Sequence, residues 1–278
     1  MTIVALFAIC IFAASACDSE LETIDTVTPE PVNNESPEPE PTANETLVHE
    51  PIDSDVTVPE DLSPIVGYAR MTTTGYALST PNTDGETSVE NALANRRSHR
   101  NFQNKALTEE QLSQLLWAAY GVTSPSPDAH LRGGLRTSPS AGATYPLEIY
   151  AVVGNVEGIE PGVYRYISAD HSIERVAEGD VRHELSDAAL GQRMVSQAPV
   201  TIFYSAIFSR TTDRYGDRGV LYVYIEVGHS AQNVYLQAEA LGLGTCAIGA
   251  FTDDQVRRLL SLPDDEEPLY LMPVGFIS

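Results

Sequence analysis

"RYGDRGVLYVYIEVGHSAQNVYLQAEALGLGTCAIGAF", residues 214–251, joins a long helical pattern to the start of a strand. Apolar or small residues recur every three or four positions, which predicts a helix over residues 222–241. A strand is expected over residues 245–251, directly after the helix. This order lacks the regular strand–helix–strand alternation of parallel sheets and favours an α+β fold. The predicted buried stripe of the helix is Ile225, Gly228, Ala231, Tyr235 and Ala238.

Shorter patterns complete this fold class. The clearest helix spans residues 108–120, where Thr108 and Gln111 can form a capping box and Gly121 can end the helix. One face of it carries Leu112, Leu115, Leu116 and Ala119. Further strands are expected over residues 147–153, 162–167, 200–206 and 269–275, and further helices over residues 180–190 and 253–260.

Composition divides the 278 residues into an acidic N-terminal part and a globular part. The net charge is −23, and residues 18–61 hold 14 acidic residues and no basic ones. One globular domain is predicted over residues 65–278. Because both parts are acidic, nucleic acid and anionic membrane surfaces are excluded as expected partners.

The N-terminus resembles an export signal. Residues 3–16 form an apolar run, and "ASAC" at residues 14–17 resembles a lipoprotein box. We expect a signal peptide over residues 1–17 and an exported protein anchored to the membrane on the outer face through lipidated Cys17. An ordinary signal and an uncleaved anchor remain alternatives, and the protein is cytoplasmic if the signal interpretation is wrong.

The segment over residues 18–64 is predicted to be a disordered linker, because its Pro, Glu, Thr and Asn content leaves little to bury. Asn34 and Asn44 match the N-glycosylation acceptor pattern.

Several familiar motifs are set aside. "GLGTCA" at residues 242–247 fits a dinucleotide fingerprint, but it follows a helix and precedes a strand, the reverse of the required order. Its glycines are interpreted as a helix end and a tight start to the strand. Cys246 is expected to be a small buried residue and His229 a structural hydrogen-bonding residue. The histidines show no metal-ligand spacing, so no metal is expected.

Three other stretches could form a binding site. "NRRSHRNF" (residues 95–102) gathers arginines, which fits either anion binding or a solvated basic turn. "PSAG" (residues 139–142) is small enough for its backbone to approach a flat ligand, or to form a simple turn. "CAIGAF" (residues 246–251) offers backbone N–H groups beside a strand.

Together these stretches resemble the nitroreductase family of flavin enzymes, and more narrowly its SagB-type dehydrogenase branch. The similarity runs from about residue 88 to residue 275 and includes "LLWAAYGVT", "PSAGATYPLEIY" and "EEPLYLMPVG". The resemblance implies an α+β fold with a central, mostly antiparallel sheet flanked by helices. It also implies an intertwined homodimer that binds FMN at its interface.

The resemblance also suggests which residues form the site. The family's first FMN motif, which engages the phosphate and the pyrimidine, corresponds to Arg96, Arg97, Ser98 and Arg100. The small loop that lines the flavin from the other subunit corresponds to Pro139, Ser140, Ala141 and Gly142. The segment whose backbone amides face the flavin N5 corresponds to Ala247, Ile248, Gly249 and Ala250.

A Lys–Tyr pair implicated in catalysis in this branch corresponds to Arg214 and Tyr215. Arginine is too basic to accept a proton at ordinary pH, so Tyr215 is the candidate for proton transfer. A pair that only shapes the pocket remains the alternative.

The expected function is therefore an FMN-dependent oxidoreductase that passes electrons from a donor such as NAD(P)H to a small organic acceptor. One alternative is a dehydrogenase that converts azolines to azoles in peptides. Another is a lipoprotein that binds flavin or another ligand without catalysis.

Overall fold

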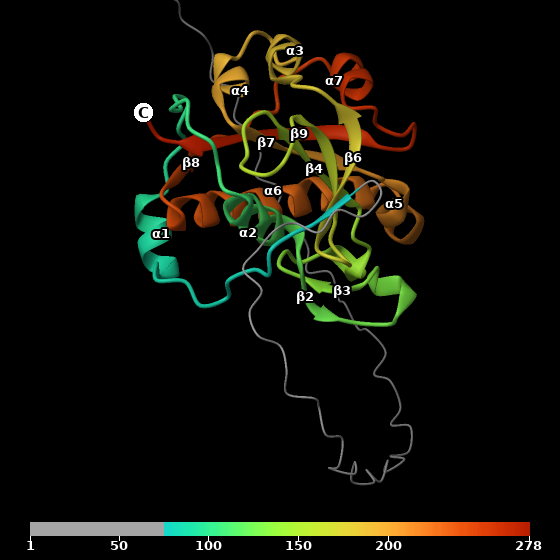
Figure 1. Ribbon diagram of the computed structural model, residues 1–278. Helices are drawn as coiled ribbons and strands as arrows, with labels where there is room; N and C mark the ends of the chain where they lie inside the picture. Colours follow the sequence, from blue (N-terminus) through green and yellow to red (C-terminus); the bar gives the residue numbers. More distant parts are fainter. Residues whose placement is uncertain (1–74) are drawn as a thin grey trace, which may run out of the picture. The chain divides into compact units, whose positions relative to one another are not determined.

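The computed structural model describes residues 75–278 (Figure 1). The predicted signal peptide, the predicted linker, both acceptor asparagines and the start of the predicted domain lie outside the described residues. Within the described part, no helix is long and apolar enough to cross a membrane.

A seven-stranded sheet forms the middle layer, and every strand pairing in it is antiparallel. The order across the sheet is β1-β6-β5-β4-β7-β9-β8. Its strands are β1 (Gly75–Ala77), β4 (Leu147–Val153), β5 (Gly162–Ile167), β6 (Ser172–Glu178), β7 (Val200–Ala206), β8 (Leu243–Thr245) and β9 (Glu267–Phe276). A separate hairpin joins β2 (Val122–Pro125) to β3 (Gly134–Arg136).

Helices cover both faces of the sheet (Figure 1). The helices α1 (Val89–Asn95), α2 (Glu109–Tyr120) and α6 (Arg218–Ala240) lie on one face. The short helices α3 (Arg182–Ala188), α4 (Arg193–Gln197) and α7 (Asp253–Leu259) lie on the other. The remaining helix α5 (Ser209–Tyr215) precedes α6, and two 3₁₀ turns span Ala129–Leu131 and Ala141–Ala143.

Strand β4 shows why the sheet is enclosed. Its side chains alternate, so Leu147 and Ile149 join the core under α2 and α6, whereas Tyr150 and Val152 join the core under α3, α4 and α7. A strand buried on both faces reads as a continuous apolar run rather than as an alternation. The expected α+β class with an antiparallel central sheet is confirmed.

Most predicted elements are found. The strands over residues 147–153, 162–167 and 200–206 have the predicted bounds, and the capping box of Thr108 and Gln111 is formed. The helix over residues 180–190 is shorter than predicted, and the long helix begins four residues earlier than predicted, at Arg218.

The predicted strand over residues 245–251 was largely wrong. Strand β8 ends at Thr245, and beyond it only Ile248 pairs with the sheet, through a bridge to Leu271. Small residues with free backbone groups read like a strand in the sequence, although here they form an irregular segment at the end of the sheet.

The predicted stripe of α6 was also partly wrong, because Ile225 and Gly228 are exposed. The first turns of α6 are apolar all round, so periodicity alone could not select the buried face. The residues that α6 buries are Gly219, Val223, Glu226, Val227, Ser230, Ala231, Val234 and Ala238.

Candidate functional site

The arginine segment that follows α1 lies against β8. Ser98 forms a parallel bridge with Thr245, and the His99 N–H donates to the Thr245 carbonyl at 2.9 Å. Gly244 permits this close approach because it has no side chain. A Cβ at this position would lie only 2.8 Å from the Cβ of His99, which is too close. The glycines of "GLGTCA" thus serve packing, with Gly242 in a left-handed turn after α6, as the sequence predicted.

Tyr235 of α6 joins this segment to the one after β8. Its hydroxyl lies 3.0 Å from the Ser98 hydroxyl and accepts a hydrogen bond from the Ala247 N–H at 2.8 Å. The guanidinium of Arg96 lies over the Tyr235 ring, 5.2 Å from its centre. Two of the three predicted stretches are therefore brought together, and we call them the arginine half of the site: residues 96–100 and 247–250.

The arginine half presents hydrogen-bond donors. Arg97 is used locally, since it donates to the carbonyls of Ala94 and Arg96. Neither Arg96 nor Arg100 forms an ion pair or donates a side-chain hydrogen bond within residues 75–278. The exposed backbone N–H groups of Gly249 and Ala250 also have no acceptor in this part of the chain.

The third stretch lies elsewhere, along the other side of α6. Asn233 donates to the Thr137 carbonyl and to the Ser138 hydroxyl, which fixes the start of the small loop. Farther along the loop, Gly142 adopts a φ of +59° and its carbonyl accepts a hydrogen bond from Arg214 at 3.1 Å. We call residues 139–142 with Arg214 and Tyr215 the loop half of the site.

Gly142 also lies against the predicted catalytic pair. A Cβ at this position would collide with the Tyr215 hydroxyl and would lie 2.9 Å from Nη1 of Arg214. Tyr215 packs edge-on against Tyr222, which fixes its ring beside the loop. The structure thus brings Arg214 and Tyr215 to the small loop.

Glu226 is a buried carboxylate behind the loop half. It is 2% exposed, accepts a short hydrogen bond from the Tyr120 hydroxyl and interacts with Ser140 of the loop. Burial raises the pKa of the Glu226 carboxyl to about 7, against the opposing influence of Ser140, Tyr120 and Arg136. The Glu226 carboxyl therefore gains and loses its proton near neutral pH.

The two halves lie on opposite sides of α6. Glu226 and Tyr235 are nine residues apart, which is two and a half turns at 3.6 residues per turn. Their side chains leave the helix in opposite directions and about 13 Å apart along its axis. One chain therefore does not place the two halves around a single ligand.

Three residues that organise these halves were not identified from the sequence. Tyr235 was assigned to a packing stripe, and nothing local in the sequence marked its link to Ser98 and Ala247. Arg136 precedes the small loop and received no role from the sequence, yet its guanidinium lies over the Tyr120 ring at 4.3 Å. Glu226 did carry a signal, because it is an acid at the spacing of Val223, Val227 and Ser230 on the buried face.

Two other interpretations have clear outcomes. Cys246 is 1% exposed and burial raises the pKa of its thiol, so it is the small buried residue that was predicted. His229 was predicted to form structural hydrogen bonds, which is wrong, because it is exposed and has no partner within residues 75–278. His171 has that role instead, with Ser113 and Tyr166 each 2.8 Å from its ring nitrogens.

Comparisons with known proteins agree with this fold. A Methanocaldococcus jannaschii protein provisionally named a nitroreductase is 50% identical over 190 residues, covering 68% of this chain and 91% of that protein. A solved Ralstonia eutropha structure with the same provisional name has a TM-score of 0.63 and 28% identity, covering 79% of this chain and 98% of that one.

A third similarity is to the Escherichia coli microcin synthetase McbBCD complex, solved with truncated pro-MccB17 bound. Its TM-score is 0.55 at 25% identity, covering 72% of this chain and 75% of that one. The resemblance to the family and to its SagB-type branch is thereby confirmed. Because residues 93–276 match the sequence profile of the nitroreductase family, this chain belongs to that family of oxidoreductases.

Proposed function

We propose that the protein is an FMN-dependent oxidoreductase whose flavin site is completed by a second copy of the chain. The observation that carries this proposal is the junction at Tyr235. It joins the segment of Arg96 and Arg100, which have no ion pair within residues 75–278, to the segment of Gly249 and Ala250, whose N–H groups have no acceptor in that range. A phosphate at one end of a ligand and a planar polar ring at the other suit these donors.

The residues present fit FMN in this half. Arg96, Arg100 and the Ser98 hydroxyl would hold the phosphate, and the backbone N–H groups of Gly249 and Ala250 would face the ring. Arg97 would support its segment by donating to the Ala94 carbonyl, and Ile248 would support its segment through its bridge to Leu271. When bound, FMN supplies hydride transfer at its N5 position, and donors held beside that position stabilise its reduced form.

The loop half would close the site from the partner subunit. Pro139, Ser140, Ala141 and Gly142 leave room for backbone to lie against a flat ring. Tyr215 would hold or deliver a proton at its hydroxyl oxygen, while Arg214 stays charged and fixes the Gly142 carbonyl.

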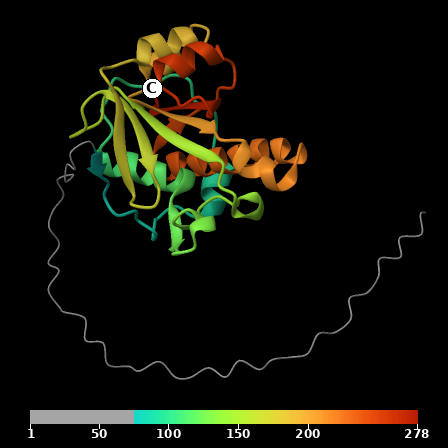
Figure 2. The same cartoon turned by 90° about the vertical axis from the view of Figure 1, so that its right-hand side faces the viewer.

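An exposed apolar surface supports the homodimer. Figure 2 shows α5 and the first turns of α6 extending beyond the sheet. Four apolar side chains of α6 are between 39% and 53% exposed there: Val220, Leu221, Tyr224 and Ile225. Such a surface on a helix commonly marks a protein interface.

The test is to purify the full chain and measure bound flavin by absorbance, with sedimentation to measure its oligomeric state. We expect a yellow dimer whose flavin is bleached by NADH or NADPH without oxygen and recovers its colour with an acceptor. A chain that takes up no added FMN would disprove the cofactor assignment. Flavin that stays oxidised with both donors would instead favour a non-catalytic binding protein.

A peptide substrate is the second candidate, favoured by the similarity to the microcin complex solved with truncated pro-MccB17 bound. In that case the flavin would oxidise an azoline ring in a peptide to an azole. An azoline peptide that bleaches the flavin without oxygen, where NAD(P)H does not, would favour this candidate.

A further inference from the structure

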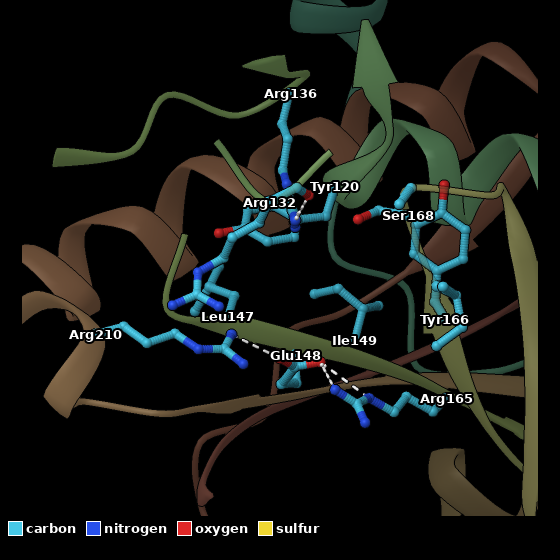
Figure 3. A pocket seen from close by; sticks show the side chains of 12 residues that line it. Tyr120, Arg132, Arg136, Leu147, Glu148, Ile149, Arg165, Tyr166, Ser168 and Arg210 are labelled. Carbon is cyan, nitrogen blue, oxygen red and sulfur yellow. Dashed lines mark hydrogen bonds and ion pairs between the residues drawn. The ribbon is translucent and has the colours of Figure 1, made fainter. Parts of the chain in front are cut away.

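A second group of arginines surrounds a separate cavity of about 190 Å³ (Figure 3). The cavity lies where the β2–β3 hairpin, β4, β5 and α5 meet. Its basic side chains are Arg132, Arg136, Arg165 and Arg210, and Glu148 is the only acid that lines it. Four arginines and one glutamate give the lining a formal charge of +3, within a chain whose net charge is −23.

Two of the arginines engage both carboxylate oxygens of Glu148. Arg165 donates to its Oε2 at 2.8 and 3.1 Å, and Arg210 is 2.6 Å from its Oε1. Figure 3 shows both pairs converging on this carboxylate from opposite sides. Because both oxygens are engaged, Glu148 has little capacity left to neutralise the other two arginines.

Arg132 and Arg136 are the two arginines that Glu148 does not pair with, although the charge of Arg136 also acts on the buried carboxylate of Glu226. The Arg136 guanidinium lies 4.3 and 4.7 Å from the ring centres of Tyr120 and Tyr145 and donates to the Arg132 carbonyl at 3.3 Å. Its Nε is buried without an acceptor within residues 75–278. The Arg132 guanidinium has no hydrogen bond or ion pair in the described part of the chain. Partial burial and the charge of nearby Arg210 lower the pKa of the Arg132 guanidinium, against the opposing influence of Glu148.

Part of the remaining lining is apolar, and Ser168 contributes a polar side chain. Leu147, Ile149 and Ile167 form part of the wall, and Tyr166 forms another part. Inorganic phosphate would pair with the arginines but would leave the apolar part of the wall exposed to water. A carboxylate carried on a short apolar body would satisfy both, since guanidinium groups match carboxylate geometry.

We propose that this cavity binds a small organic carboxylate, anchored by Arg132 and Arg136, with its apolar body against Leu147 and Ile149. A neighbouring cavity shares Arg132 and Arg210 and is also lined by Gly142 and Arg214. The carboxylate site therefore adjoins the loop half. The inference goes beyond the proposed function, and binding can be measured without turnover.

The test is calorimetric titration of the full chain with hexanoate, with its neutral analogue hexanamide, and with inorganic phosphate. We expect saturable binding of hexanoate and none of hexanamide. Arg132→Gln should weaken hexanoate binding about tenfold or more, because a charge-assisted hydrogen bond is lost. Arg132 is exposed and makes no side-chain contact that folding would require.

The matched control is Arg258→Gln, which removes an equally exposed arginine of α7 outside the cavity and should leave the affinity unchanged. Three results would overturn the proposal: no hexanoate binding, equal binding of hexanamide, or equal affinity in the Arg132 variant. Phosphate binding without hexanoate binding would overturn the carboxylate assignment. Flavin content, measured on the same samples, reports on the proposed oxidoreductase separately.

Discussion

The arginine half and the loop half of the candidate site are built in contrasting ways. In the arginine half, segments 150 residues apart in the sequence meet at one hydroxyl, that of Tyr235. In the loop half, a short stretch is held by neighbours on α2, α5 and α6, with a buried carboxylate behind it. The first half offers unpaired cations and free N–H groups, whereas the second offers space and groups that can exchange a proton.

The difference predicts that ligand binding depends on the arginine half and that proton transfer depends on the loop half. The arginine half has the donors that would hold an anionic ligand under the proposed function, and substitutions there should act on the affinity for that ligand. The loop half has Tyr215 and Glu226, and substitutions there should act on shape and on protonation. Because α6 lies between the two halves, each can be altered while the other serves as an internal reference.

The largest effect is expected from Arg96→Ala combined with Arg100→Ala. Loss of two charged phosphate contacts should cost about 4 kcal/mol of FMN binding, roughly a thousandfold in affinity. Equilibrium dialysis with FMN measures it. Arg258→Ala is the control, and retained FMN affinity in the double variant would contradict the phosphate assignment.

The next effect concerns Glu226 and pH. Between about pH 4.5 and 7 the unfolded chain releases this proton while the folded chain keeps it. The free energy of unfolding therefore falls by about 3 kcal/mol across this window as pH rises. Glu226→Gln, which still accepts a hydrogen bond from Tyr120, should remove this loss and be the more stable protein at pH 8.

Urea unfolding of both proteins at pH 4.5 and pH 8 measures this difference. Exposed Glu110→Gln is the control and should keep the pH dependence of the unaltered chain. Parallel pH profiles for the Glu226 variant and the unaltered chain would rule out a proton held on Glu226.

A smaller effect is expected from Gly142→Ala. A left-handed alanine costs about 1 kcal/mol, and collision with Tyr215 should raise the total to about 2 kcal/mol. Gly158→Ala is a matched control, since Gly158 also has a positive φ but has no atom within 4 Å of an added Cβ. Thermal unfolding should separate the two variants, and equal losses would show that Tyr215 can move away from the loop.

The smallest effect is expected from Tyr235→Phe, which removes only the hydroxyl that joins Ser98 and Ala247. Loss of the acceptor for the Ala247 N–H should cost about 1 kcal/mol of stability and loosen FMN binding severalfold. Glu110→Gln, an exposed substitution outside both halves of the site, is the control. Unchanged stability and FMN affinity would mean that the two segments hold their positions without this junction.

Local chemistry explains which parts of the fold could be predicted. Strand β4 is an apolar run interrupted only by Glu148, and Thr108 lies three residues before Gln111, so the strand and the capping box were both predictable. The buried face of α6 could not be predicted, because the exposed residues Leu221, Tyr224 and Ile225 are as apolar as the residues that α6 buries. Only contacts with α2 and the sheet decide between these faces.

The same limit applies to the candidate site. The composition of residues 96–100 and 139–142 marked them, but nothing in either stretch shows that they lie on opposite sides of one helix. Glu148, Arg165 and Arg210 come from three elements far apart in sequence, so their charges meet only through the sheet register and the position of α5.

The position of α6 between the two halves has a consequence for subunits that carry different defects. In a two-fold dimer each site would take its arginine half from one copy and its loop half from the other. A dimer of one chain altered at Arg96 and Arg100 and another altered at Gly142 would place both defects in the same site. Its second site would contain neither defect, so subunit exchange between the two variants would create one unaltered site in each mixed dimer.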